Sequence, residues 1–551
     1  MPVKRLRARS AHVQPAIPAR PRLLPRTRWG KAALLLLLVA TLCRSLIFAS
    51  SQPTLLGADE DYHFHYVNHL VIEHSLPTIS GDFATAELFA MAELTQLGAF
   101  LQGPVGAFEG RPHSVVKRLD ELPGAYLQPT APGTRNVLHA PGYHVGAALV
   151  DRAVIHDSPV TRLTLMRYYS AVLGAIGVFF AWLLAAQLLA RTWQQLAAAA
   201  LVAFQPIAAF SSSTMTNDVL VLLGMTATLA WCAFLLRTPP RAAQGVGLGL
   251  MLTVGLYSKS TALALVPIVG FALLLLLAAN RDRWRAVLKI GAWGFGLPLL
   301  LVGWWYVYAR VQSGSFLGGS AAVGDTLASR SAHGIGFVPT AIGDWFSNVY
   351  PGYWFQYLAY EVTQRDLWYY LPLGLGLVGA VGLVVRIVEL RHRLLDRTDG
   401  ELRQILVLLS APLILLGPPL FVDVVRQLKG LPYAENQARF LVPAFPAVAV
   451  LMMIGFRQLT ARIRYGLPVL AGVLVAVAAV FYWRNYVTWS LERFYGSIGD
   501  LGLDEVLRNA GWLKPEWVGP AWFITLFAIA VVATLGALGC AVVDARRPQS
   551  R

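Results

Sequence analysis

Apolar runs of bilayer length recur along the whole chain and are separated by shorter polar segments. A helix rises 1.5 Å per residue, so about 20 apolar residues cross the hydrocarbon core of a bilayer. Twelve runs fit or approach this length, at residues 32–50, 168–190, 194–211, 218–236, 246–258, 261–279, 287–308, 368–388, 405–422, 440–456, 465–483 and 521–543. The pattern predicts an all-α polytopic membrane protein of about 12 transmembrane helices.

Positive charge alternates from one connection to the next along this series. If the chain starts in the cytoplasm, both tails and every even-to-odd connection lie inside. Each of these segments is basic, as cytoplasmic segments of membrane proteins are. The residues concerned after the first tail are Arg191; Arg237 and Arg241; Arg281, Arg283, Arg285 and Lys289; Arg391, Arg393, Arg397 and Arg403; Arg457, Arg462 and Arg464; Arg546, Arg547 and Arg551. We therefore expect both termini to be cytoplasmic.

The same topology divides the chain into tails, membrane domain and outer loops. We expect a basic cytoplasmic tail at 1–31, a membrane domain at 32–543 and a second tail at 544–551. The first extracytoplasmic loop is large, and the outer segments are expected at 51–165, 309–367, 423–439 and 484–520. The basic segment before the first run is unusually long for a signal peptide, so we interpret that run as an uncleaved helix.

Composition supports a membrane protein and argues against other classes. Hydrophobic residues make up 56% of the chain and charged residues 14%, whereas soluble proteins carry roughly a quarter charged residues. The net charge of +16 does not indicate nucleic-acid binding, because the basic residues lie in short connections. The three cysteines fall in apolar runs, so no disulfide framework is expected. A composition rich in Ala, Leu, Gly and Arg suggests a bacterial source, and hence the bacterial inner membrane.

An acidic segment opens the first outer loop. Asp59, Glu60 and Asp61 precede His63 within the stretch from Gly57 to His65. If this stretch is helical, Asp59 and His63 lie one turn apart on one face. They would then bind a divalent cation such as Mg²⁺ or Mn²⁺, or the carboxylate would orient the imidazole as a base. Alternatively, the acidic residues only complement the dipole at a helix N-terminus.

Two further polar positions fall on the same predicted side. Asn217 and Asp218 begin the fourth apolar run, where either residue also serves well as a helix N-cap. Lys259 lies at a turn between two apolar runs, against the charge bias that fixes orientation. A lysine that extends along the interface to reach water is the alternative explanation for this position.

Arg439 and a turn before the second run complete the candidate set. Arg439 immediately precedes the tenth run, and its planar guanidinium suits a phosphate or a carboxylate; an interfacial anchor beside Phe440 is the alternative. His139 and Tyr143 belong to a His-Ala-Pro-Gly-Tyr-His turn that leads into a helix. Together the candidates supply cations for a lipid phosphate, carboxylates for a reacting group or metal, and apolar walls for lipid.

At these motifs the chain resembles the GT-C-fold glycosyltransferases, which are polytopic enzymes with an acidic motif in the first outer loop. More narrowly, it is similar to a bacterial family of uncharacterised GT-C-like membrane proteins with an Asp-Glu-x-x-His loop. The matching stretches are 58–63, 139–143, 217–218, 258–259 and 437–440, in the same order across residues 35–460. The departures from the family pattern are Ala58 and Ala140 for Pro, Ala438 for Gly and Phe440 for Tyr, and none removes an ionisable group.

The resemblance implies transfer of a sugar from a polyprenyl-phosphate donor to a hydroxyl acceptor outside the cytoplasmic membrane. Asp59 would be the general base, and Glu60 and His63 would orient it or hold a divalent cation. Lys259 and Arg439 would stabilise the charge that develops on the lipid phosphate. The acceptor would be a glycan, a lipid or a protein.

Two other functions use the same residues. A transporter or flippase of lipid-linked saccharides would bind a headgroup, but it usually places ionisable residues near mid-membrane, whereas these lie at helix ends. A non-catalytic scaffold for envelope assembly would tolerate a degenerate acidic loop, whereas Asp59 and Glu60 are both present.

Overall fold

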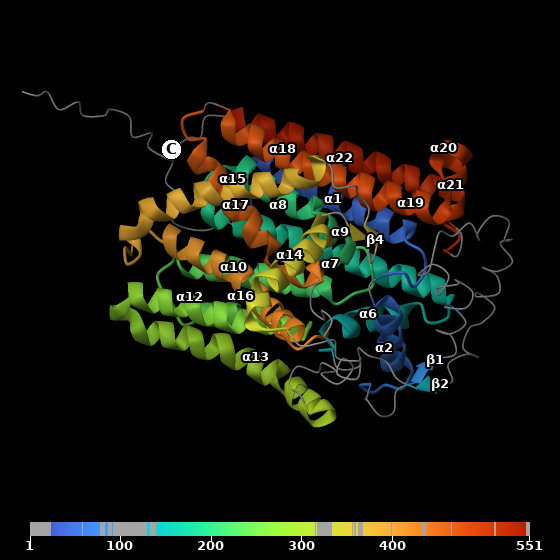
Figure 1. Ribbon diagram of the computed structural model, residues 1–551, viewed down its shortest axis with the longest axis horizontal. Coiled ribbons are helices and arrows are strands. Elements are labelled where there is room, and N and C mark those ends of the chain that lie inside the picture. Colours follow the sequence, from blue (N-terminus) through green and yellow to red (C-terminus); the bar gives the residue numbers. More distant parts are fainter. Residues whose placement is uncertain are drawn as a thin grey trace, which may run out of the picture.

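The computed structural model shows a bundle of long helices that run side by side (Figure 1). It describes residues 24–57, 59–77, 83–85, 91, 129–132, 139–314, 316, 333–354, 356–357, 360–361, 367–397, 399–431, 437–463, 465–511 and 514–546. The C-terminus lies toward the left in this view, whereas α2 (Glu60–Ile72), α6 (Gly142–Ala153) and a small strand pair lie toward the right. We call the end that carries α2 and α6 the site end.

Most of the remaining helices follow the predicted apolar runs, whereas the helices at Val338–Trp354, Trp489–Tyr495, Ile498–Leu501 and Leu503–Ala510 lie in segments expected as outer loops. In chain order they are α1 (Arg28–Ser51), α7 (Pro159–Leu188), α8 (Thr192–Phe204), α9 (Pro206–Ser211), α10 (Asp218–Leu235), α11 (Gln244–Leu256), α12 (Leu265–Ala279), α13 (Trp284–Ser313), α14 (Val338–Trp354), α15 (Leu367–Leu390), α16 (Glu401–Leu428), α17 (Phe445–Leu459), α18 (Gly466–Phe481), α19 (Trp489–Tyr495), α20 (Ile498–Leu501), α21 (Leu503–Ala510) and α22 (Pro520–Arg546). The short 3-10 helices η1 (Ser260–Ala264) and η5 (Ala438–Ala444) lead into α12 and α17.

The fold is predominantly helical, as the sequence predicts, but the number of crossings differs. Within the described part of the chain, ten helices are long and apolar enough to cross a membrane. The expected number of about 12 is therefore not confirmed. The difference arises from α8 and α11, which have 13 residues each. Helix α8 ends early because Pro206, which has no backbone N–H, starts a separate short helix.

Helix α7 begins well before the apolar run that predicted it. Pro159 is its first residue, and the Ser158 side chain accepts a hydrogen bond from the Thr161 N–H at 3.2 Å, as an N-cap does. The first turns contain Arg162 and Arg167, which lower the local hydropathy although both are buried. The last residues of the expected first outer loop are therefore helical.

A second difference concerns the segment expected as an outer loop from residue 484. Helix α18 passes without interruption into the π-helix η6 (Tyr482–Thr488) and then into α19. The aromatic and polar residues of η6 reduce the hydropathy but do not break the backbone hydrogen bonds. Short π segments of this kind occur inside α-helices, frequently at functional sites.

Short strands in the described residues occur outside the long helices. Strand β1 (Phe83–Thr85) pairs antiparallel with β2 (Pro129–Pro132), and β3 (Gln356–Tyr357) pairs with β4 (Tyr360–Glu361). These two ribbons do not alter the helical class of the protein.

Packing at the site end fixes α2 and α6 against the bundle. One buried apolar cluster joins these helices to α7 and to the turn before α10. Its members include Leu55, Phe64, Val67, Tyr143, Ala147, Leu163, Met166, Met215 and Val219. Burial of large apolar side chains stabilises a fold by about 1.5–3 kcal/mol for each of them. The segments that carry the candidate residues are therefore held by a common core.

Candidate functional site

Four charged side chains from four distant segments meet at one place. The Arg439 Nη2 atom lies 2.6 Å from Asp59 Oδ2, and the Lys259 Nζ atom lies 2.8 Å from Asp218 Oδ1. The two pairs are linked, because Arg439 Nε lies 4.0 Å from Asp218 Oδ2. We call Asp59, Asp218, Lys259 and Arg439 the charge quartet. The quartet brings together four residues that the sequence singled out.

Asp59 stands immediately before α2 in a left-handed backbone conformation, with φ at 55°. Asp and Asn tolerate this region better than most other side chains, yet it remains a strained position. Its side chain is 38% exposed, compared with 9% for Asp218 and 15% for Arg439. Asp59 is therefore the carboxylate of the quartet that a molecule from solution reaches most easily.

Asp218 and Lys259 form the buried half of the quartet. Asp218 is the first residue of α10, and Asn217 before it donates from Nδ2 to the Ser258 carbonyl oxygen at 3.3 Å. The Asn217 side chain does not cap α10, so it ties the start of this helix to the turn that carries Lys259. Asp218 and Lys259 therefore pair with each other. This arrangement differs from both alternative explanations, which were a simple helix N-cap for Asn217 or Asp218 and a lysine that reaches water for Lys259.

Phe440 packs against both cations of the quartet. Lys259 Nζ lies 5.3 Å and Arg439 Cζ 5.6 Å from the centre of its ring. Cations at this distance from an aromatic face are stabilised by its quadrupole, by about 0.5–1 kcal/mol or more. The residue that departs from the tyrosine of the resembled family thus keeps an aromatic ring at this position.

A row of aromatic rings borders the quartet. His63 Nδ1 and His144 Nε2 form a hydrogen bond of 2.9 Å, and the Tyr66 ring stacks on His144 at 3.9 Å. The His139 ring stacks on His63 at 6.1 Å. Burial and then the charge of Lys259 lower the pKa of His139 to about 3, although Asp218 and Asp59 oppose the shift.

Burial favours the neutral form of these imidazoles. Burial, followed by the neighbouring His144 and His139 rings, holds the pKa of His63 well below its ordinary value. A neutral imidazole donates one hydrogen bond and accepts another, so the row suits polar, uncharged groups such as hydroxyls. Tyr143 lies behind it, fully buried, with its hydroxyl 2.7 Å from Ser170 Oγ.

Glu60 points away from the quartet and into the protein. Its carboxylate forms an ion pair with Arg167 in α7, with Nη2–Oε2 at 2.5 Å and Nε–Oε1 at 2.7 Å, and both side chains are fully buried. The backbone N–H groups of Met215 and Gly57 also donate to it, at 3.0 and 3.1 Å. Burial alone would raise the pKa of Glu60, but these contacts outweigh it and lower the pKa.

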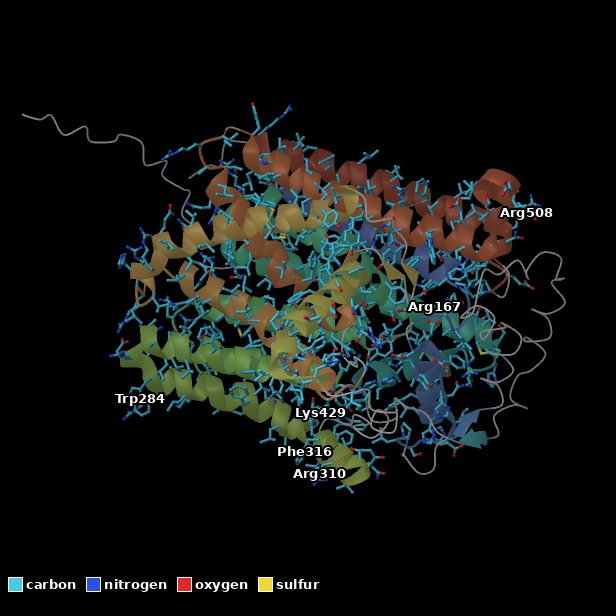
Figure 2. All side chains as sticks on the ribbon, in the orientation of Figure 1. Arg167, Trp284, Arg310, Phe316, Lys429 and Arg508 are labelled. Carbon is cyan, nitrogen blue, oxygen red and sulfur yellow. The ribbon has the colours of Figure 1, made fainter. Side chains whose placement is uncertain are left out.

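Arg167 was not among the residues that the sequence singled out. Its other nitrogen contacts are the carbonyl oxygens of Ala49, Gln52 and Pro53 at 2.7–3.0 Å, so it joins α7 to the end of α1 and to the acidic segment. Figure 2 labels it toward the site end. An arginine at the edge of an apolar run is the signal that could have revealed it, since a charge within a membrane helix needs a partner.

The residues expected to hold a divalent cation do not form a metal site as they are arranged. Asp59 faces the Arg439 guanidinium, and His63 Nδ1 is engaged by His144. Within the described residues, no group of three or more His, Cys, Asp or Glu side chains is placed to hold a metal ion. The carboxylates of the quartet are neutralised by Lys259 and Arg439 instead.

Solved structures with a similar arrangement of helices include two membrane enzymes. The oligosaccharyltransferase of Archaeoglobus fulgidus in its apo form is 12% identical, with a TM-score of 0.47, and the match covers 86% of this chain and 56% of that one. ArnT from Cupriavidus metallidurans bound to undecaprenyl phosphate is 14% identical, with a TM-score of 0.40, and the match covers 93% and 77%. This chain thus spans little more than half of the archaeal enzyme.

Sequence comparison places the chain in a family. Among curated proteins, none matches it significantly. The pattern of the DUF2142 family, described as predicted membrane proteins, matches residues 42–425, which include three of the four quartet residues and Arg167. This match covers well over half of the 551 residues, so the chain belongs to the DUF2142 family of predicted membrane proteins.

Proposed function

We propose that this protein is a membrane glycosyltransferase that moves a sugar from a polyprenyl-phosphate donor to a hydroxyl acceptor on the extracytoplasmic face. The observation that carries the proposal is the charge quartet at the end of an apolar helix bundle. It offers two cations for a phosphate, an accessible carboxylate for a proton, and nearby lipid-facing helices for a polyprenyl chain.

The number of charges favours a donor with a single phosphate. The quartet contains two cations and two carboxylates, and Asp218 remains buried against Lys259. A phosphodiester brings one negative charge, which Arg439 would neutralise in place of Asp59 while Lys259 stays paired with Asp218. A diphosphate would bring further charge for which the described part of the site has no additional cation.

In the proposed reaction, the acceptor oxygen forms a bond to the anomeric carbon of the sugar. The bond between that carbon and the phosphate oxygen breaks, and its electron pair stays on the phosphate. The acceptor proton passes to Asp59. Stabilisation of the developing phosphate charge by positioned cations is often the largest catalytic contribution, and loss of one such contact costs about 3 kcal/mol.

The other candidate residues take supporting places in this proposal. His139 and Asn217 lie next to the quartet, where His139 offers a neutral polar edge to the sugar or the acceptor. Tyr143 and Glu60 are buried against Ser170 and Arg167, so we assign them to holding α6 and the acidic segment in place. The acceptor class stays open between a glycan, a lipid and a protein.

The site end is proposed to face away from the cytoplasm of a bacterial inner membrane. The support is the distribution of basic residues, which gather in the connections at the opposite end of the predicted topology. Both termini would then be cytoplasmic, and a lipid-linked donor would reach the site from the outer leaflet.

The test is sugar transfer by purified, reconstituted protein supplied with synthetic undecaprenyl-phosphate sugars and a panel of hydroxyl acceptors. Loss of a general base typically lowers the rate by a factor of about 10²–10⁴, so Asp59→Asn should lose at least about a hundredfold. Asp61→Asn, two residues further along α2, is the matched control and should retain activity. Equal turnover by wild type and Asp59→Asn would remove Asp59 from this role.

The expected divalent cation is tested separately. Because the quartet neutralises its own carboxylates, we expect transfer to continue after extensive dialysis against a chelator. Restoration of lost activity by added Mg²⁺ or Mn²⁺ would instead show that the acidic segment rearranges to bind a metal.

A further inference from the structure

The carboxylate proposed as the base is engaged by the guanidinium proposed to bind phosphate. Asp59 Oδ2 lies 2.6 Å from Arg439 Nη2, which is the distance of a strong charge-assisted hydrogen bond. The two residues are separated by 380 positions in the sequence, so the contact depends on the tertiary fold. The charged groups of the site are therefore arranged as two ion pairs.

Arg439 cannot serve Asp59 and a phosphate with the same donor at once. A phosphate oxygen that accepts from Nη2 takes the position that Asp59 Oδ2 occupies. When Asp59 leaves, the Arg439 charge is still partly neutralised by Asp218, whose Oδ2 atom lies 4.0 Å from Arg439 Nε. The phosphate then supplies the second negative charge.

The two carboxylates of the quartet differ in how readily they are displaced. Asp218 pairs with Lys259 at 2.8 Å, and both side chains are less than a tenth exposed, so separating them would leave buried charges. Asp59 is 38% exposed and precedes α2 in a strained backbone conformation. A carboxylate there can turn to solvent at small cost, so Asp59 is the group that an incoming phosphate replaces.

We propose that the Asp59–Arg439 ion pair is a lock that the donor phosphate opens. The phosphate displaces Asp59 from Arg439, and only then is the carboxylate available to accept the proton of the acceptor hydroxyl. Donor binding thus precedes activation of the acceptor. This inference rests on the proposed function and adds to it an order of events and a competition between Asp59 and the phosphate for one guanidinium.

The competition predicts an unusual variant, because a substitution that abolishes transfer should tighten donor binding. The measurement is the affinity of full-length protein in detergent or nanodiscs for undecaprenyl phosphate at about pH 7.5. Asp59→Asn removes the competing charge, and asparagine accepts the left-handed backbone. Loss of a competing ion pair of about 1 kcal/mol corresponds to a roughly fivefold change in the dissociation constant. We therefore expect Asp59→Asn to bind undecaprenyl phosphate at least about fivefold more tightly than wild type.

Asp61→Asn is the matched control, because it removes one negative charge from the same segment without touching the Asp59–Arg439 pair. We expect its affinity to stay within about twofold of wild type, since the effect of a general charge falls with distance and screening. Asp59→Gly, which also permits the backbone conformation, repeats the test if the asparagine variant unfolds. Affinity of the Asp59 variants equal to or weaker than wild type would overturn the lock.

Failure of the lock and failure of the proposed function give different results. If wild type binds undecaprenyl phosphate and transfers sugar while inactive Asp59→Asn binds with unchanged affinity, only the lock is wrong. If wild type binds no undecaprenyl phosphate, the proposed function and the lock both fail. If Asp59→Asn and Asp61→Asn both bind undecaprenyl phosphate more tightly by the same factor, the gain in affinity comes from the change in net charge alone. That result also overturns the lock.

Discussion

Asp59 and Glu60 are neighbours in the sequence, yet their side chains have opposite surroundings. Asp59 is more than a third exposed and faces Arg439 of η5, whereas Glu60 is completely buried against Arg167. A buried ion pair is costly to break, because the remaining charge has no water to solvate it. The structure therefore favours a positioning role for Glu60, whereas Asp59 is the more accessible carboxylate.

Substitution of Glu60 separates these roles. Glu60→Gln keeps the shape of the side chain but leaves the Arg167 charge buried without its counter-charge, which typically costs about 3–5 kcal/mol. We expect a clear fall in the thermal unfolding temperature, measured in detergent. Glu73→Gln, at an exposed glutamate just after the same helix, should leave this temperature unchanged.

The opposite result is equally informative. Unchanged unfolding temperature together with a large loss of transfer would mean that Glu60 acts on the reacting groups directly.

Much of the site could be predicted at the level of residue type and of position at helix ends. Asp59, Asp218, Lys259 and Arg439 all lie at or near the ends of apolar runs, where polar residues attract notice. Their pairing could not be predicted, because hydropathy carries no information on which helix ends meet. Arg167 was missed since the apolar run starts at residue 168, so the sequence placed this arginine outside the predicted helix.

At the scale of elements, small residues decide how closely the helices approach. Helix α15 packs along α17, and a Cβ atom added at Gly455 would overlap the carbonyl oxygen of Gly379. A Cβ atom added at Gly382 would meet the carbonyl oxygen of Gly455 in the same way. Close backbone contact at small residues is a common source of helix association in membranes.

This contact predicts a position-dependent effect of alanine. Gly455→Ala must push the α15 and α17 backbones apart, and overpacking of this kind costs about 1–3 kcal/mol. Gly472→Ala in α18 is the control, because a Cβ atom there meets no neighbour within 4 Å and alanine favours a helix. We expect a lower unfolding temperature for the first variant only; equal temperatures would show that the two helices separate without cost.

The elements themselves were largely predictable, because lipid requires long apolar helices. The helices that were predicted wrongly have local causes, which hydropathy averaged over a window of residues does not detect. Pro206 divides one apolar run into α8 and α9, and η6 carries a helix across a polar stretch. Both features depend on the hydrogen bonds of the backbone, which the polarity of the side chains does not reveal.

For the whole molecule, the two ends of the bundle differ in their chemistry. Trp284 lies at the left end in Figure 2, toward the C-terminus, and Arg508 lies toward the end that carries α2. The connections with the predicted cytoplasmic charge include the exposed Arg281 and Arg283 near Trp284. This basic connection thus lies at the opposite end of the bundle from α2 (Figure 2).

The orientation can be measured with single cysteines in a background without Cys43, Cys232 and Cys540. We expect Ser497→Cys, exposed after α19, to react with a membrane-impermeant maleimide in intact cells. Arg283→Cys, exposed between α12 and α13, should react only after the membrane is permeabilised. The reverse pattern would place the quartet on the cytoplasmic side and would contradict an extracytoplasmic transferase.

Assembly of the quartet from positions 59, 218, 259 and 439 also has a consequence during biosynthesis. Asp59 and the Asp218–Lys259 pair emerge from the ribosome long before Arg439, and translation proceeds at about 5–20 residues per second. For many seconds the growing chain therefore holds Asp59 without the Arg439 guanidinium that pairs with it in the folded protein. A product truncated before residue 439 would therefore lack the complete charge quartet.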